Sequence, residues 1–465
     1  MLFTEARFLL FFILAFCLYW MLRRNVHRKV WLLICSYIFY AAWDWRFLSL
    51  ICVSTMVDYI AGAFMSKREG RARRKPFLMA SLFCNLVLLG FFKYFNFFYD
   101  STVEFLQMMG FSASSSTLEI ILPVGISFYT FQTLSYTIDI YRGKLKPVDS
   151  LLDFALFVGF FPQLVAGPIV RASEFLPQLL QKHKIRDVAF RACLTLFLFG
   201  YIKKACVADN FALIVDPIFA DPNAYSTLVN WLALFLYGVQ IYCDFSGYSD
   251  MAIATAGLLG YQLPLNFDFP YLTRSITDFW RHWHISLSSW FRDYVYIPMG
   301  GDRRGVFFTY FNLITVFFLC GLWHGARWNF VLFGLYHGVF LVLERATGFG
   351  RIKPSWRPLQ YIYTVFVSMS AWAVFRNVDL ASILTMWKRM FGFGGDAAER
   401  IPGEPIWFLA LAGFAVIHVA MKNRFLHKTV GAMPDWLFYV VYGAAVGIVL
   451  PFAAAGYKPF IYFQF

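Results

Sequence analysis

The stretch that decides the fold runs from Val306 to Leu343 and reads VFFTYFNLITVFFLCGLWHGARWNFVLFGLYHGVFLVL. Its first part, Val306 to Trp323, contains no charged residue, and its second part, Asn329 to Leu343, is almost purely apolar. Each part approaches the roughly 20 residues that a helix needs to cross a bilayer. A short polar break that contains His324 separates the two parts. The sequence therefore predicts two membrane helices with a polar site at their junction.

The whole chain has the composition of a membrane protein. Of its 465 residues, 60% are hydrophobic and 15% are charged, whereas roughly a quarter of the residues of a soluble domain are charged. Apolar stretches recur from end to end, which predicts an all-α polytopic integral membrane protein with about eleven transmembrane helices. The first stretch lacks a basic region before it and a cleavage site after it, so we expect an anchor and not a signal peptide. Thirteen stretches are candidates, and because some are short for a crossing the number carries an error of two. They are Phe8 to Leu22, Val30 to Trp43, Phe47 to Met65, Pro76 to Phe98, Ile120 to Ile140, Phe190 to Tyr201, Leu228 to Tyr242, Met251 to Leu263, Val306 to Trp323, Asn329 to Leu343, Leu359 to Phe375, Ile406 to Met421 and Trp436 to Phe452.

The net charge of +14 follows the connections between these stretches and does not indicate nucleic-acid binding. Basic residues cluster in Arg23 to Lys29, in Lys67 to Lys75 and in Arg142 to Lys146. By contrast, Tyr99 to Glu119 has three acidic residues and no Lys or Arg. Because Lys and Arg are retained on the cytoplasmic side of a membrane, we expect the three basic connections inside and the N-terminus outside. Solvated cytoplasmic loops would account for most of the basic residues.

The cysteines give no sign of a disulfide, a metal site or a thiol nucleophile. All eight lie in or beside apolar stretches, and none forms a CxxC pair. We expect them to be small buried hydrophobic side chains. A metal or haem site is also disfavoured, because His324 and His337 fall on different sides of a helix. No metal site is therefore expected.

One apolar stretch, Asp153 to Pro177, contains helix breakers. Gly159, Pro162, Gly167 and Pro168 interrupt it, so it cannot form one uninterrupted helix. A re-entrant element beside a cavity is one interpretation, because irregular backbone at membrane depth needs protein or water around it. A kinked structural helix is the other.

The densest polar stretch is SITDFWRHWHISLSSWFRDYVYIP, Ser275 to Pro298. On one continuous helix, at about 100° per residue, His284 shares a face with Arg281 and Ser288, whereas His282 points elsewhere. A Trp-rich amphipathic helix can lie at the membrane interface in a purely structural role. Ionisable groups between apolar spans, however, usually face an interior or a wet cavity. The pattern leaves both interpretations open.

His324 is the candidate catalytic residue at the polar break. Gly321 and Gly325 flank it, so backbone can approach closely and the helix can end there. A histidine in an apolar surround stays neutral and can accept a proton, as a general base for a hydroxyl must. The alternative is a structural histidine bonded to a carbonyl.

These two polar stretches resemble a known family. FWRHWHISLSSWFRDYVYIPMGG, followed by GLWHGARWNFVLFGLYHG, is similar to the membrane-bound O-acyltransferase family, and in particular to its bacterial alginate O-acetyltransferase-type branch. The similarity extends over residues 30 to 345, with further support from VGFFPQLVAGPIVRASEFLPQL and YCDFSGYSDMAIATAGLLGYQLPLNFDFPYL. It implies a single membrane domain over residues 1 to 465, in which helices at about 355 to 455 follow the family-like core. One departure is His282, which stands where the family has a basic residue, usually Arg.

The resemblance implies the roles of several residues. The family's catalytic histidine corresponds to His324, and its second active-site histidine corresponds to His284. In the family these two lie in a central tunnel through the membrane, with re-entrant and amphipathic helices around it. We expect Arg281, Ser288, Trp323 and Asn329 to line the tunnel or the substrate site.

The resemblance also implies the reaction. An acyl group, expected to be acetyl, moves from a cytoplasmic donor such as acetyl-CoA across the bacterial inner membrane to a hydroxyl of a polysaccharide such as alginate. His324 acts as general base or carries the acyl group transiently. No cofactor is expected to be bound. Separate extracytoplasmic acetyltransferases of the serine-hydrolase type complete the transfer, and this chain contains no GxSxG motif.

Two alternatives remain. Within the family, D-alanyl transfer to teichoic acid is the main rival. Outside it, a transporter could line its path with His324, His284 and Arg281 without chemistry, although the chain shows no inverted repeat. In every case, membrane lipids surround the protein.

Overall fold

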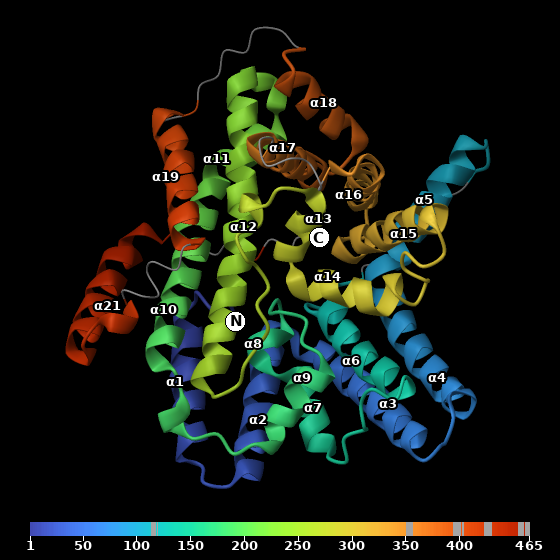
Figure 1. The fold of residues 1–465 in the computed structure, drawn as a ribbon, viewed down its shortest axis with the longest axis vertical. Coiled ribbons are helices and arrows are strands. Elements are labelled where there is room, and N and C mark those ends of the chain that lie inside the picture. The colour runs from blue at the N-terminus through green and yellow to red at the C-terminus, as the bar shows by residue number, and fades with distance from the viewer. Residues whose placement is uncertain are drawn as a thin grey trace. The chain divides into compact units, whose positions relative to one another are not determined.

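Helices dominate the computed structural model, which describes residues 1–112, 118, 120–349, 357–393, 401, 404–422, 430–453 and 460. No β-strand occurs among these residues (Figure 1). Seven helical segments of this part are long and apolar enough to cross a membrane, and the shorter α1 (Ala6–Met21) is also apolar. The predicted all-α architecture is confirmed, while the number of crossings stays a prediction.

Two compact units make up the chain. The first comprises residues 1–189 and 255–264, and the second comprises residues 190–254 and 265–465. The long helix α12 (Thr227–Leu258) contributes residues to both. The other helices of the first unit are α1, α2 (Asn25–Asp44), α3 (Leu48–Ser66), α4 (Arg71–Leu89), α5 (Phe95–Met108), α6 (Ile126–Tyr141), α7 (Leu151–Gly159), α8 (Phe161–Leu164) and α9 (Ala172–Leu180). Those of the second are α10 (Phe190–Tyr201), α11 (Asp209–Ala220), α13 (Ile276–His282), α14 (Ile285–Phe291), α15 (Val306–His324), α16 (Trp328–Thr347), α17 (Arg357–Arg376), α18 (Leu380–Met390), α19 (Glu404–Lys422) and α21 (Asp435–Val449).

The interruption predicted between Asp153 and Pro177 is confirmed. The chain forms α7, α8 and α9 there, with irregular backbone between the last two. This backbone is buried. At the junction of α7 and α8, the Ser36 hydroxyl accepts from the Phe161 N–H at 3.1 Å, and Gln163 donates to the Phe157 carbonyl at 2.8 Å. Protein therefore surrounds the non-helical segment, as its apolar setting requires.

Two residues of the first basic cluster are not solvated loop charges, which corrects our expectation. Arg28 and Lys29 lie in α2 and are 7% and 8% exposed. Lys29 forms an ion pair with Asp153 of α7, and Arg28 donates to the carbonyls of Leu22 and His183, both at 2.7 Å. Buried charges need such partners because their desolvation is costly. This part of the basic charge is paired inside the first unit.

The crossing expected at Leu228 to Tyr242 and most of the one expected at Met251 to Leu263 belong to one helix that ends at Leu258, so the expectation of two separate crossings is wrong. The polar residues between them, YCDFSGYSD, continue α12 and do not form a loop. Most of this helix is buried inside the protein. Polar side chains can therefore stay in it as long as other parts of the chain satisfy them.

Two lysines of a π-helical segment, Ile202–Ala208, supply these partners. Lys204 forms ion pairs with Asp244 of α12 and with Asp209, and Lys203 lies 2.6 Å from Asp250 of α12. The pairing explains why a run with two aspartates remains helical in an apolar protein. π-Helical segments are rare and often occur at functional sites.

The stretch that predicted two membrane helices forms the hairpin of α15 and α16. A Cβ atom at Gly321 would lie 2.2 Å from the carbonyl oxygen of Phe330, and one at Gly334 would lie 2.1 Å from that of Phe317. The two glycines therefore permit a contact between the helices that no other residue allows. α15 ends at His324, as the sequence predicts for this break.

Candidate active site

The helix expected over Ser275 to Pro298 is broken in its middle. α13 and α14 are separate helices, and between them Trp283 is extended and His284 is left-handed, with φ of 44°. The expectation of one continuous helical phase is therefore wrong. His284 does not share one helix face with Arg281 and Ser288.

Backbone hydrogen bonds to an upstream segment hold this break open. The Asp268 N–H donates to the His282 carbonyl at 3.0 Å, and the Ile285 N–H donates to the Asn266 carbonyl at 2.9 Å. A continuous helix would pair these groups of His282 and Ile285 within itself. The helical period of the sequence could not reveal the competing partner, because that partner lies in another segment.

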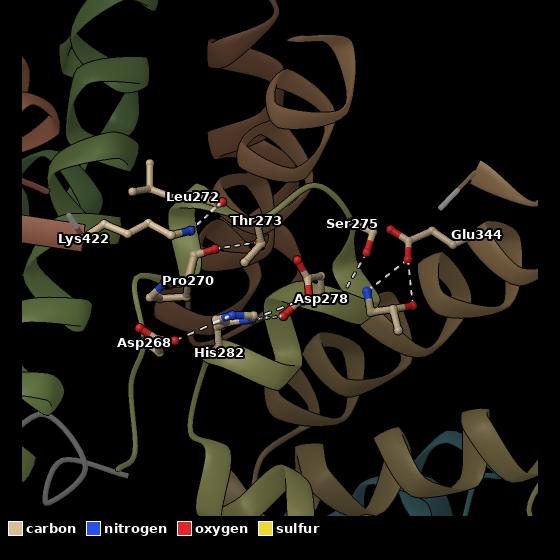
Figure 2. A network of polar contacts seen from close by, with 10 residues as sticks. Asp268, Pro270, Leu272, Thr273, Ser275, Asp278, His282, Glu344 and Lys422 are labelled. Atoms are coloured by element: carbon tan, nitrogen blue, oxygen red, sulfur yellow. Dashed lines mark hydrogen bonds and ion pairs between the residues drawn. The ribbon is translucent and has the colours of Figure 1, made fainter. Parts of the chain in front are cut away.

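Side chains fix the N-terminus of α13, as Figure 2 shows. The Glu344 carboxylate of α16 accepts hydrogen bonds from the N–H groups of Ile276 and Thr277. The Ser275 hydroxyl accepts from the Asp278 N–H at 3.0 Å. Both contacts satisfy amides that a helix leaves unpaired, and the carboxylate complements the helix dipole.

His282 lies at the other end of α13, between two carboxylates (Figure 2). Its Nδ1 is 2.8 Å from the Asp278 carbonyl oxygen and 3.7 Å from the Asp278 carboxylate. Its Nε2 is 3.8 Å from the Asp268 carboxylate. His282 is half-buried, and these contacts give it a role in holding the end of α13 against the upstream segment.

His284 is fully buried. Its Nδ1 lies 3.1 Å from Oδ1 of Asn266. Its ring packs edge-on against Phe245 of α12 and Trp323 of α15, with centroids 4.7 and 5.4 Å away. Burial lowers the pKa of His284, which lies outside the candidate membrane spans, to about 3. The imidazole is therefore neutral at neutral pH.

His324 is buried at the end of α15 among three aromatic rings. The centroids of Trp323, Phe333 of α16 and Phe375 of α17 lie 5.2, 5.7 and 5.6 Å from that of its imidazole. Trp323 thus contacts the rings of both His284 and His324. The structure brings together, through one indole, the two histidines that the resemblance singled out.

A cavity of about 450 Å³ is lined by residues that neighbour this pair in the sequence. Neither histidine lines it, but Ile285, which follows His284, and Cys320, one turn before His324, both do. The predicted lining residues Arg281 and Ser288 belong to its wall. The full lining is Thr277, Trp280, Arg281, Ile285, Ser288, Ser289, Phe291, Arg292, Tyr296, Leu313, Val316, Phe317, Cys320, Leu341 and Arg345.

The cavity combines cationic and apolar walls. Three arginines, Arg281, Arg292 and Arg345, contribute to it together with the aliphatic and aromatic side chains of α15 and α16. Arg292 pairs with Asp293 at 2.7 Å, and Arg345 lies 3.4 Å from Asp302. Such a lining suits an anionic group with an apolar extension.

The other two residues expected to line the tunnel have different surroundings. Asn329 donates from Nδ2 to the Phe375 carbonyl at 3.0 Å and so connects the start of α16 to the end of α17. Trp323 packs between the histidines. Neither residue lines the cavity, and a lining role for them stays a prediction.

No role is predicted from the sequence for Asn266, the direct partner of His284. Asn266 is fully buried, and its amide also donates to Ser249 of α12 at 3.3 Å. The signal that could have found it is a polar residue between apolar ones in PLNFDFP, a few residues after the polar part of α12. A buried amide of this kind needs partners, and here one partner is a histidine.

Comparisons with known proteins agree with one another. The sequence profile of the membrane-bound O-acyltransferase family matches residues 147–376. The chain is 36% identical to the probable alginate O-acetylase AlgI of Pseudomonas putida, with 100% of both chains covered. It is 35% identical to the peptidoglycan O-acetyltransferase of Helicobacter pylori, over 89% of this chain and 81% of that protein. The teichoic acid D-alanyltransferase of Streptococcus thermophilus is 31% identical over 48% of this chain and 57% of its own length.

Proposed function

Because this chain belongs to the membrane-bound O-acyltransferase family, we propose a specific activity for it within that chemistry. It is a multi-pass membrane acyltransferase, as the sequence predicted. In our proposal it moves an acetyl group from a cytoplasmic donor across the bacterial inner membrane. The acetyl group is then attached to a hydroxyl of an extracytoplasmic polysaccharide such as alginate.

The observation that supports this proposal is the pair of buried histidines joined by Trp323. His284 directly precedes α14 and His324 ends α15, yet both rings contact the same indole. A cavity with three arginines is lined by Ile285, which follows His284, and by Cys320, one turn before His324. Acyl transfer to a hydroxyl requires a proton acceptor close to a site for the acyl donor, and in our proposal the histidines and the cavity take these two roles.

His324 is the proposed general base. It takes the proton of the acceptor hydroxyl while the acceptor oxygen forms a bond to the acyl carbon, and the donor's leaving group departs and takes up a proton. In the second possible sequence, His324 carries the acyl group before the hydroxyl attacks. In both, the neutral ring of His284 orients a reacting group.

Acetyl-CoA, or another cytoplasmic acetyl donor, is the proposed substrate of the cavity. Its phosphates would pair with Arg281 and Arg345, since guanidinium groups bind phosphate oxygens in bidentate fashion. Its acyl end would extend along the apolar wall towards Cys320, one turn from His324. No cofactor resides in the protein in this proposal.

The acceptor and the partner are proposed from the relatives. Two of them are named for O-acetylation of alginate and of peptidoglycan, so a surface polysaccharide is the expected acceptor. An extracytoplasmic acetyltransferase of the serine-hydrolase type would complete the transfer. This chain has no GxSxG motif of its own for such a nucleophile.

Inverted inner-membrane vesicles test the reaction. Vesicles that contain the protein, its partner and the polymer are given [14C]acetyl-CoA at the exposed cytoplasmic face. We expect alkali-labile label to accumulate on polymer inside the lumen, because the ester forms on the far side of the membrane. Vesicles from cells without the protein are the control.

The same vesicles separate the rival reaction. Alkali-labile label from an activated D-[14C]alanine donor, with none from acetyl-CoA, would establish D-alanyl transfer in its place. If neither donor labels the polymer although the protein is abundant and folded, the proposed function is wrong.

The N-terminus is proposed to be periplasmic and the Lys67 to Lys75 connection cytoplasmic. A cysteine at Met108, which is 81% exposed at the end of α5, should react with a membrane-impermeant maleimide added to intact spheroplasts. A cysteine at the exposed Glu69 should react only after the membrane is opened. The parent, with its eight native cysteines, gives the background. The reverse labelling pattern would contradict this orientation. Residues 113–117 and 119, in the last part of the predicted outer connection, lie outside the described residues.

A further inference from the structure

Asn266 is placed beside the helix break by its backbone. Its carbonyl accepts from the Ile285 N–H, and two residues later the Asp268 N–H donates to the His282 carbonyl. These two bonds align residues 266–268 with residues 282–285. The side chain of Asn266 therefore has a fixed position next to His284.

The Oδ1 atom of Asn266 lies within hydrogen-bond distance of three groups. They are Nδ1 of His284 at 3.1 Å, the backbone N–H of Ser286 at 3.3 Å and the Ser286 hydroxyl at 2.8 Å. The amide nitrogen of Asn266 donates to the Ser249 hydroxyl at 3.3 Å. All of these groups are buried.

The orientation of the Asn266 amide follows from one of these contacts. A backbone N–H can only donate, so the atom that faces the Ser286 N–H must be the amide oxygen. An oxygen there can only accept from His284. The proton of the neutral imidazole must then be on Nδ1, and Nε2 carries the lone pair.

We propose that Asn266 is a positioning residue that holds His284 in the Nδ1–H tautomer, so that Nε2 is the atom that accepts a hydrogen bond from a reacting group. This inference rests on the proposed function, in which His284 acts in acyl transfer. Ser249 of α12 secures the amide, and the left-handed backbone of His284 directs the ring towards Trp323. A histidine in the other tautomer would present a donor where the reaction needs an acceptor.

The described ring contacts of His284 include three aromatic side chains. Phe245 of α12, Phe267 and Trp323 of α15 pack against the imidazole with centroids at 4.7, 6.4 and 5.4 Å. These three side chains are uncharged. Trp323 in turn contacts the imidazole of His324, which is a titratable group.

The first test reads the tautomer directly. 15N NMR of histidine-labelled full-length protein in detergent, with His284→Gln to assign the signal, should show Nδ1 protonated and Nε2 unprotonated in the parent. Asn266→Asp should keep this tautomer, because a carboxylate oxygen accepts in the same place. Asn266→Ala should lose it. A parent with the proton on Nε2 overturns the inference, whether or not the protein transfers acetyl groups.

The second test uses the vesicle assay. Asn266→Ala should lower kcat about 10-fold or more, with little change of KM for acetyl-CoA. Asn266→Asp should recover much of this loss and move the acid limb of the pH–rate profile to higher pH, because its negative charge favours the imidazolium of His284.

A matched control separates positioning from the general loss of a buried amide. Asn312 of α15 is 2% exposed and donates to the Gly301 carbonyl at 2.9 Å. Asn312→Ala should lower the melting temperature without moving the pH profile. If Asn266→Ala and Asn312→Ala change kcat equally, or if Asn266→Asp leaves the pH profile in place, Asn266 has only a structural role. A parent that transfers no acyl group contradicts the proposed function, and the NMR result still decides the tautomer.

Discussion

Replacing His284 by Ala should reduce acyl transfer about 100-fold, whereas His282→Ala should reduce it several-fold at most. His284 is buried and hydrogen-bonded to Asn266, and its ring contacts the indole that also packs on His324. His282 is half-buried and contacts Asp278 and Asp268, which lie outside this group. The measurement is transfer of label in the vesicle assay, normalised to the amount of each variant in the membrane.

A third variant identifies what His282 contributes. His282→Arg places a permanent cation between the carboxylates of Asp268 and Asp278, and we expect it to retain activity. Equal losses in His284→Ala and His282→Ala, with both proteins abundant, would contradict the assignment of His284 to the reaction.

The helices of this protein were predictable where apolar composition alone determines them. α10 spans Phe190–Tyr201, which are the bounds that the sequence predicts, and α15 begins at the predicted Val306. In such segments a helix is the structure that satisfies every backbone group without water. The interruption after Gly159 was also predictable, because proline and glycine act through local backbone geometry.

The prediction failed where distant residues pair with polar side chains. The polar middle of α12 looked like a connection, but Lys203 and Lys204 of another segment supply partners for its aspartates. In the same way, Arg28 and Lys29 looked like loop charges until Asp153 and backbone carbonyls were found beside them. A hydropathy scale assigns each polar residue a free-energy cost of burial. It does not include the ion pair or hydrogen bond that offsets this cost in the folded protein.

The roles of the candidate site residues stay predictions, and their geometry could not be predicted from the sequence. The histidines were identified by resemblance, and Arg281 and Ser288 do line a cavity. The continuous helix that would place Arg281 and Ser288 on one face with His284 is absent. Residues 266–268 form backbone hydrogen bonds with His282 and Ile285 and so separate α13 from α14. Asn266 went unnoticed for the same reason: its importance comes from a hydrogen bond across the fold.

His324→Ala has the largest expected effect, a loss of about 100-fold or more in kcat/KM. Removing the imidazole takes away the proposed proton acceptor. The ring also packs against Trp323, Phe333 and Phe375, so the variant should be somewhat less stable as well. The loss of thermal stability must therefore be measured separately from the loss of activity.

His337 provides the matched control. It is fully buried in α16, and its ring lies 4.8 Å from that of Phe333, which also contacts His324. His337→Ala removes an equally buried imidazole from the same helical hairpin and leaves the contacts of Trp323 in place. We expect both variants to lose a similar amount of thermal stability, and His337→Ala to retain activity per folded molecule. If His324→Ala is unstable but as active per folded molecule as His337→Ala, then His324 is a structural histidine, and a path without chemistry becomes the better account of the site.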